Sequence, residues 1–338
     1  MVVDKKPNVI SFFCGCGGSS LGYKRAECNI LLASDWEKKA LDIYKHNFPE
    51  TQIFQADIRV VNLDVITNLT GIKKGELDIL DGSPPCTPFS TCGLREQGWG
   101  KSYIHSADTK PQKADDLFFE FIRLIDELKP KTFVAENVSG LIKGTAKGYY
   151  KQIIQQMKDI GYNTQSFLLN AADYEVPQRR ERVIIIGFRN DIKQDESIVL
   201  KKFPYRISFR KAVEGLKNSD DELEHARKLS RSFLKQYISI LPMGKNLSRF
   251  HKKGHHFNTK RESFDKPIST IIASSLSLVH PSENRYLTLA EVKRCATFSD
   301  DFWFPSIKAG CERIGNSVPP NLMKHIAKYV IKRANLDK

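Results

Sequence analysis

Short apolar runs alternate with helix-like stretches through the first half of the chain. The runs NVISFF, NILLAS, TQIFQ, LDIL, KTFVAE and RVIIIGF, all between residues 8 and 188, are rich in β-branched residues and typical of buried strands. Between them, helical patterns occupy Ser19–Glu27, Trp36–Asn47, Lys113–Leu128 and Tyr149–Ile160. This alternation predicts an α/β fold, with a mostly parallel, doubly wound sheet of the Rossmann-like type.

The alternation fades after about residue 189 into a basic, turn-rich region, and a helical tail at 321–334 follows it. Residues 189–284 contain 19 Lys and Arg against 11 Asp and Glu, and thus carry +8 of the net charge of +14. A basic excess of this size favours a polyanionic partner, of which nucleic acid is the commonest. The run RFHKKGHHF at Arg249–Phe257 contributes to it, although such a run is equally typical of a solvated loop.

Length and composition narrow the class of protein. At 338 residues the chain exceeds the ~250–300 at which single cores stop growing, so we expect a large lobe and a smaller one. No run of ~18 apolar residues occurs, which predicts a cytoplasmic protein without membrane contact. The seven cysteines are scattered and form no CxxC pair, which favours free thiols over disulfides or a zinc site.

Candidate ligand-binding residues follow the first three predicted strands, where an open α/β sheet binds its ligands. The loop FCGCGG allows a tight turn but lacks the third glycine of a dinucleotide motif and the Lys of a triphosphate loop. Asp35 can accept hydrogen bonds from ribose, Trp36 can lie against a purine, and Asp57 can accept from an exocyclic amine. Each is also a common helix cap or core aromatic, but together they fit an adenosine without phosphates, with S-adenosylmethionine the obvious candidate.

The stretch GSPPCTPFS places Cys86 among three prolines, directly after the LDIL run. Proline fixes its own φ and biases the preceding residue toward extended geometry, so the thiol has little backbone freedom. Such stiffness suits a group that must be aimed, although a small buried cysteine in a Pro-rich loop is common too.

Six motifs occur in an order that resembles the cytosine carbon-5 DNA methyltransferases of the bacterial restriction-modification type. They are FCGCGG, SPPC, ENV, QRRER, RYLTLAE and GNSVPP, and they span residues 13–320. Two positions depart from the usual pattern: Thr87 replaces a Gln after the cysteine, and CATFSDDF replaces the commoner QGFPDDF.

The resemblance implies a role for each matched residue. Cys86 would be the nucleophile, Glu136 the acid in the target-base pocket, and Arg180 and Arg182 would orient the cytosine and Glu136. Around S-adenosylmethionine it places Phe13, Gly15, Gly18, Asp35, Trp36, Asp57, Ile58, Pro85, Leu117, Asn316 and Val318. No metal is implied.

The resemblance also divides the chain. It implies a cofactor-binding and catalytic domain over 1–188, a target-recognition region over 189–284 that coincides with the basic segment, and a return to the first domain over 285–338. The partner would be double-stranded DNA, whose target cytosine is flipped out, and we expect a monomer. The long interval 86–113, with several glycines, is typical of an active-site lid.

Three alternatives remain open. A tRNA cytosine methyltransferase on the same scaffold would use the same chemistry, and a DNA-binding relative could keep the fold without the activity. A thiol redox protein acting through Cys14 and Cys16 lacks the CxxC spacing. Neither the target sequence nor a paired restriction endonuclease can be inferred from the chain, because base specificity depends on which side chains reach base edges.

Overall fold

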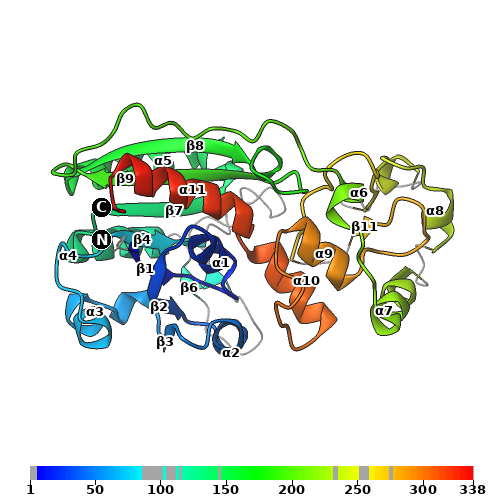
Figure 1. Ribbon diagram of the computed structural model, residues 1–338, viewed down its shortest axis with the longest axis horizontal. Helices are drawn as coiled ribbons and strands as arrows, with labels where there is room; N and C mark the ends of the chain where they lie inside the picture. Colours follow the sequence, from blue (N-terminus) through cyan, green and yellow to red (C-terminus); the bar gives the residue numbers. More distant parts are fainter. Residues whose placement is uncertain are drawn as a thin grey trace, which may run out of the picture.

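The computed structural model describes residues 6–85, 102–103, 112–113, 116–143, 146–230, 235–250, 259–273 and 277–337. In this part of the chain, seven strands form one sheet in the order β3-β2-β1-β4-β7-β9-β8. Their bounds are β1 Asn8–Phe12, β2 Asn29–Asp35, β3 Gln52–Gln55, β4 Ile79–Gly82, β7 Thr132–Val138, β8 Tyr162–Asn170 and β9 Glu181–Arg189. All neighbours pair in parallel except β9, which runs antiparallel to both β7 and β8. The predicted mostly parallel sheet is confirmed (Figure 1).

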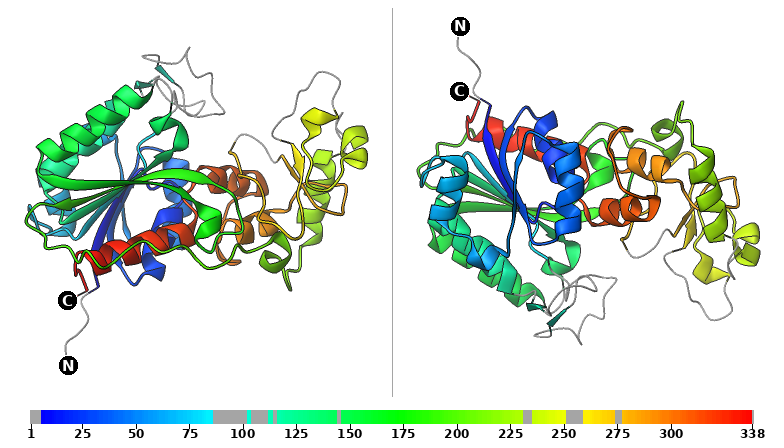
Figure 2. Two further views of the ribbon diagram at one scale, coloured as in Figure 1. Left: turned by 90° about the horizontal axis from the view of Figure 1, so that it is seen from above. Right: turned by 90° about the horizontal axis from the view of Figure 1, so that it is seen from below.

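Helices cover both faces of this sheet (Figure 2). Successive residues of one strand point to opposite faces, so Val9 belongs to one core and Ile10 to the other. Burial on both sides is the reason why the strands read as continuous apolar runs rather than as alternating ones. The helices of this lobe are α1 Gly18–Arg25, α2 Lys38–Asn47, α3 Leu63–Thr70, α4 Asp116–Leu128, α5 Lys147–Asp159 and α11 Pro320–Arg333.

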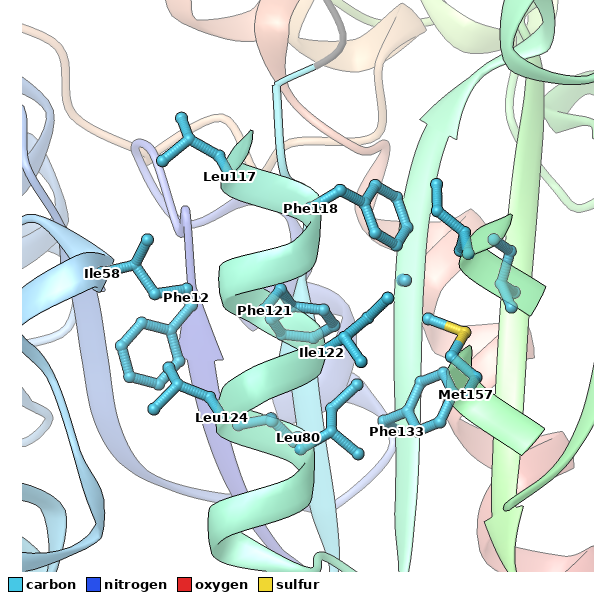
Figure 3. Close-up of a cluster of buried hydrophobic side chains, with 14 of the residues drawn as sticks. Phe12, Ile58, Leu80, Leu117, Phe118, Phe121, Ile122, Leu124, Phe133 and Met157 are labelled. Atoms are coloured by element: carbon cyan, nitrogen blue, oxygen red, sulfur yellow. The ribbon is translucent and has the colours of Figure 1, made fainter. Parts of the chain in front are cut away.

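Helix α4 shows how one core is built. Its apolar positions recur at helical spacing, and Phe118, Phe121 and Leu124 lie against Phe12 and Leu80 of the sheet (Figure 3). Full burial of one such side chain stabilises the fold by about 1.5–3 kcal/mol. The buried face of α4 therefore stabilises the strands whose carboxyl ends form the site described below. The predicted helix over 113–128 is thus confirmed for Asp116–Leu128, whereas Lys113 belongs to the short strand β6.

Helix α11 covers the opposite face together with α1. Leu322, Met323 and Ile326 are fully buried there, beside Tyr23 of α1 and Val9 of β1. The prediction that the final helix returns to the first lobe is confirmed.

The remaining helices form the smaller part of the molecule beside the sheet (Figure 1). They are α6 Phe209–Ala212, α7 Asp220–Ser230, α8 Lys235–Ile240, α9 Leu289–Cys295 and α10 Ile307–Asn316, accompanied by β10 Lys260–Arg261 and β11 Leu278–Val279. The short strands β5 Ser102–Tyr103 and β6 Gln112–Lys113 pair with each other in the interval predicted to be a lid, most of which lies outside the described residues. A third core joins α2 and the glycine loop to α9 and α10, so the two parts share buried surface.

The segment that directly follows β9 contacts the sheet lobe. Residues 192–200 still pack on the sheet lobe, where the Asp195 N–H donates to the Arg333 carbonyl at 2.8 Å. The predicted division into domains therefore stays a prediction. None of the helices in the described part of the chain combines the length and apolar character that a bilayer crossing requires.

Candidate active site

A cavity of about 1240 Å3 lies at the carboxyl ends of the parallel strands, between the two parts of the molecule. Predicted site residues converge on it from eight segments of the chain. Those that line it are Phe13, Gly15, Asp35, Trp36, Asp57, Ile58, Pro85, Leu117, Glu136, Arg180, Arg182 and Asn316. Gly18 and Val318 lie outside this lining: a Cβ on Gly18 would stand 2.6 Å from the Val318 carbonyl oxygen, so the two residues pack on each other. Cys86 lies outside the described residues.

The glycine loop turns sharply after β1. Gly15 and Gly17 both have positive φ, of 53° and 97°, which side chains other than glycine rarely adopt. The Gly15 N–H donates to Asp35 Oδ2 at 2.9 Å, and the Glu37 N–H donates to Asp35 Oδ1 at 3.0 Å. Burial raises the pKa of Asp35 in spite of these two hydrogen bonds. The Asp35 carboxylate therefore fixes the loop and keeps lone pairs for a ligand.

Two further predicted residues flank Asp35 on this side of the cavity. Trp36 follows β2, and Asp57 caps the turn after β3, where its Oδ1 accepts from the Arg59 N–H at 3.0 Å. Asp57 also pairs with the Arg59 guanidinium at 2.9 Å. Leu117 closes the opposite wall from the first turn of α4 (Figure 3). A flat indole, two carboxylates and an aliphatic wall form a site suited to a polar aromatic ring attached to a hydroxylated group.

Glu136 and Arg182 form an ion pair on neighbouring strands. Arg182 lies opposite Val138 in the antiparallel ladder, so its side chain reaches Glu136 diagonally on the same face. The Nε–Oε1 distance is 2.8 Å, and the side chains are 14% and 12% exposed. The reversed direction of β9 places its first residues beside the carboxyl end of β7. The predicted pairing of this acid with this arginine is therefore present in the fold.

Arg180 lines the same cavity and also binds backbone carbonyls of two distant segments. Its Nη1 donates to the Ile271 carbonyl at 3.1 Å and its Nη2 to the Gly315 carbonyl at 2.9 Å. Burial and the nearby charge of Arg182 lower the pKa of Arg180 well below its usual value. Arg180 thus joins three segments under the cavity, and Arg182 alone of the two contacts the acid.

Asn137, which the sequence did not single out, holds the proline loop. Its Nδ2 donates to the Pro84 carbonyl at 3.1 Å, two residues before Cys86. Asn137 is 4% exposed and follows Glu136 directly, so two consecutive residues of β7 position the acid and hold the loop that leads to the cysteine. The sequence signal that could have identified Asn137 was its position in the ENV motif.

Comparisons with known proteins agree on one family. The family model for C-5 cytosine-specific DNA methylases matches residues 7–332. The chain belongs to that family. The type II methyltransferase M.SacI of Streptomyces achromogenes is 29% identical over 96% of this chain and 93% of its own length, and M1.HphI of Haemophilus parahaemolyticus is 30% identical over 96% and 86%. In fold, the chain is similar to the Entamoeba histolytica methyltransferase EhMeth, with a TM-score of 0.70 at 19% identity over 99% of this chain and 100% of the other.

The predicted family, fold class and enzyme class are thereby confirmed.

The methylase also contains an ion pair that the sequence motifs did not predict. Arg313 of α10 binds both carboxylate oxygens of Glu37, which precedes α2, and both residues line the cavity. Because Glu37 pairs with a residue 276 positions later, only the tertiary structure brings them together.

A buried carboxylate lies beneath the methylase site. Asp81 of β4 is 2% exposed and accepts hydrogen bonds from Ser11 at 2.8 Å, Ser19 at 3.0 Å and Tyr23 at 3.2 Å. Burial raises the pKa of Asp81 to about 6 in spite of these donors. The native state consequently keeps a proton on Asp81 at pH values where the unfolded chain has released it.

We therefore expect the stability contribution of Asp81 to fall as pH rises through 6. Between pH 5 and pH 8, the free energy of unfolding of the wild type should fall by roughly 1.4 kcal/mol more than that of Asp81→Asn. Urea unfolding of both proteins at the two pH values measures this difference. Asp301→Asn, which changes an exposed carboxyl group, should behave as the wild type; parallel pH profiles for Asp81→Asn and the wild type would contradict the assignment.

The two cysteines of the glycine loop are poorly suited to redox chemistry. Cys14 and Cys16 are 7% and 1% exposed, and neither forms a disulfide. Burial raises the pKa of the Cys14 thiol well above its usual value and that of Cys16 to about 11. Reactive thiols are exposed and acidic, so the redox alternative has no support in this loop.

Proposed function

We propose that this chain methylates carbon 5 of a flipped-out cytosine in a specific duplex DNA site, through a covalent adduct with Cys86. The observation that carries the proposal is the Glu136–Arg182 pair, at 2.8 Å, in the same cavity as Asp35 and Trp36. Pro84 and Pro85 line that cavity too and lead directly into Cys86. An acid, an adenosine-type site and the two prolines that precede Cys86 therefore line one cavity.

S-adenosylmethionine fits the residues on the β1 and β2 side of the cavity. A Cβ at Gly15 would meet nothing within 4 Å, so the loop leaves room for a ligand against its backbone. Asp35 would accept from the ribose hydroxyls, Trp36 would lie against the adenine, and Asp57 would accept from the amine. When bound, S-adenosylmethionine supplies the activated methyl group. The other cofactor-contact residues implied by the resemblance remain part of this proposal.

The cytosine ring has to be activated by the protein, because its carbon 5 is a weak nucleophile. The Cys86 thiolate would add to carbon 6 while Glu136 donates a hydrogen bond or proton at ring nitrogen 3. These two contacts make carbon 5 electron-rich. Arg182 would hold Glu136 in place through their ion pair, and its planar fork leaves further N–H groups for the base. After methylation, loss of the carbon 5 proton and of the thiol restores the aromatic ring.

The target base must leave the duplex to reach this cavity. We infer that the basic segment 189–284 binds the DNA backbone and reads the site, as a monomer, in the manner of a type II restriction-modification methyltransferase. Residues 251–258 of its run RFHKKGHHF lie outside the described residues. The remainder of that segment still supplies cavity residues, among them Lys260 and Ser269.

Transfer of a tritiated methyl group to mixed duplex DNA and to tRNA tests the proposal. We expect label in DNA alone, and sequencing of the methylated cytosines should reveal one recognition site. Label in tRNA alone would identify tRNA rather than DNA as the substrate of the same reaction. Tight DNA binding with no label in DNA or in tRNA would identify the protein as a non-catalytic, DNA-binding relative.

Replacing Trp36 by Ala should weaken cofactor binding far more than it slows transfer. Loss of one aromatic platform for a base is worth about 1–3 kcal/mol, so the Kd for S-adenosylmethionine should rise roughly 5- to 150-fold while kcat at saturation changes little. Isothermal calorimetry and initial rates measure the two effects. Trp303→Ala is the matched control, because Trp303 is 39% exposed and stacks on His46 outside the cavity lining. An unchanged Kd in Trp36→Ala would remove the indole from the cofactor site.

A further inference from the structure

Two cations meet on one hydroxyl at the wall of the cavity. Arg179 Nη2 donates to Ser269 Oγ at 3.2 Å, and Lys260 Nζ donates to the same oxygen at 3.1 Å. All three residues line the cavity that holds Glu136 and Arg182. Arg179 comes from the segment before β9 and the other two from the smaller part of the molecule.

The backbone fixes these side chains. The Arg179 N–H donates to the Ile268 carbonyl at 2.8 Å, and Thr270 Oγ1 donates to the Arg179 carbonyl at 2.6 Å. Residues 178–180 and 268–271 thus lie side by side as a short bridge between the two parts of the molecule. The cation pair is therefore held in place rather than carried on a free loop.

Placing two cations together in a half-buried wall is unfavourable without an anion. Lys260 is 15% exposed; burial lowers its pKa, and the charges of Arg179 and Lys266 lower it further. Glu262 lies 3.6 Å from Lys260 and offsets one positive charge, which leaves a net positive charge on the group. In addition, the Arg179 Nε–H is buried and lacks a hydrogen-bond partner in the described structure. An unpaired buried donor of this kind costs about 1–3 kcal/mol, which a bound acceptor would offset.

From these contacts we infer that Arg179 and Lys260 form an anion subsite that takes one backbone phosphate beside the target cytosine. The inference rests on the proposed function and adds to it the group that positions the flipped nucleotide. Arg179 precedes Arg182 by three residues, so their backbones are at most about 10 Å apart. A nucleotide whose ring lies at Glu136 carries its own phosphates one sugar away, within the same cavity. Phosphate contacts of this kind fix register without reading sequence.

Arg179→Gln and Lys260→Gln test this subsite through the salt dependence of duplex binding. Each variant should lower the slope of log K against log[salt] by roughly 0.9 and raise the Kd for DNA about tenfold to a hundredfold. Because both side chains serve one phosphate, the double variant should lose the same single contact rather than two. Arg179→Lys keeps the charge and should keep the slope. Lys151→Gln, which removes an exposed cation of α5 away from the cavity and outside the basic segment, is the matched control.

Uncharged methylphosphonate linkages locate the phosphate. They are placed one at a time on each side of the target cytosine in the duplex that the wild type methylates. One position should weaken binding by the wild type and cause no further loss in Arg179→Gln. Equal penalties in both proteins, or unchanged salt slopes in the variants, would overturn the subsite.

Two controls distinguish a failure of the proposed anion subsite from a failure of the proposed function. Urea unfolding and calorimetry with S-adenosylmethionine should match the wild type in every variant; a loss of cofactor affinity alone would assign the cations to the cofactor carboxylate and overturn the inference. If the wild type methylates no duplex, the proposed function fails, while the slopes on a random duplex still decide whether the cations bind phosphate.

Discussion

A Cys86→Ser variant is expected to transfer no measurable methyl group while binding S-adenosylmethionine almost as tightly as the wild type. A hydroxyl is a far poorer nucleophile than a thiolate at neutral pH, so addition to carbon 6 should stop. The proposed cofactor site consists of Gly15, Asp35 and Trp36, which lie at the ends of other strands, so the affinity should survive. Tritium transfer and calorimetry on the same preparation measure both. Activity within tenfold of the wild type would remove Cys86 from this role.

The adduct itself can be trapped. Fluorine at carbon 5 cannot leave as a cation, so DNA with 5-fluorocytosine at the target should remain joined to Cys86 after methylation. We expect a complex that survives denaturation, forms only with S-adenosylmethionine, and is absent in Cys86→Ala. Mass spectrometry should locate the bond. A link to Cys92, which like Cys86 lies outside the described residues, would overturn the assignment.

Glu136→Gln should lower kcat by roughly 10²–10⁴-fold, because an amide cannot deliver a proton to ring nitrogen 3. Gln keeps the volume of the side chain and the reach to Arg182, so the free energy of unfolding should change little. Glu181→Gln is a close control: Glu181 lines the same cavity but pairs with Lys143, at 3.8 Å. Its rate should stay within a few-fold of the wild type. Single-turnover rates at saturating DNA and cofactor provide the comparison, and equal losses in the two variants would attribute the effect to cavity charge.

Most of the strands that the sequence reveals have both faces buried, whereas β3, which was also predicted, has no fully buried residue. Residues 182–188 form an apolar run because Ile184 and Ile185 enter opposite cores. Strand β8 was missed, since most of its residues from Asn163 to Leu168 are exposed or half-buried, and their polar sequence NTQS gives no apolar signal. Helix α3 was missed for a related reason, as only Ile66 of its eight residues is fully buried. A strand or helix with so few fully buried residues leaves too weak an apolar pattern in the sequence to be recognised.

The candidate site was predictable only as far as its motifs extend. Motif order identified Glu136 and Arg182, whose contact follows from the pairing of β7 with β9. The same reasoning gave Arg180 and Arg182 the task of orienting the cytosine and Glu136, which stays a prediction for Arg180, but it did not reveal that the Arg180 guanidinium binds the carbonyls of Ile271 and Gly315. Those partners are 91 and 135 positions away. Contacts between distant segments depend on how the two parts pack, which local sequence does not encode.

The pairing of α1 with α11 also has a consequence during protein synthesis. Tyr23 and Val9 leave the ribosome early, but Leu322 and Ile326, which cover them, are translated about three hundred residues later. At about 5–20 residues per second, that face of the sheet stays open for roughly 15–60 s. We expect nascent chains halted before residue 320 to be held by chaperones or degraded. Because Gly315 and Asn316 line the cavity and emerge just before that helix, the cavity is completed only about three hundred residues after Phe13 and Gly15 have been made.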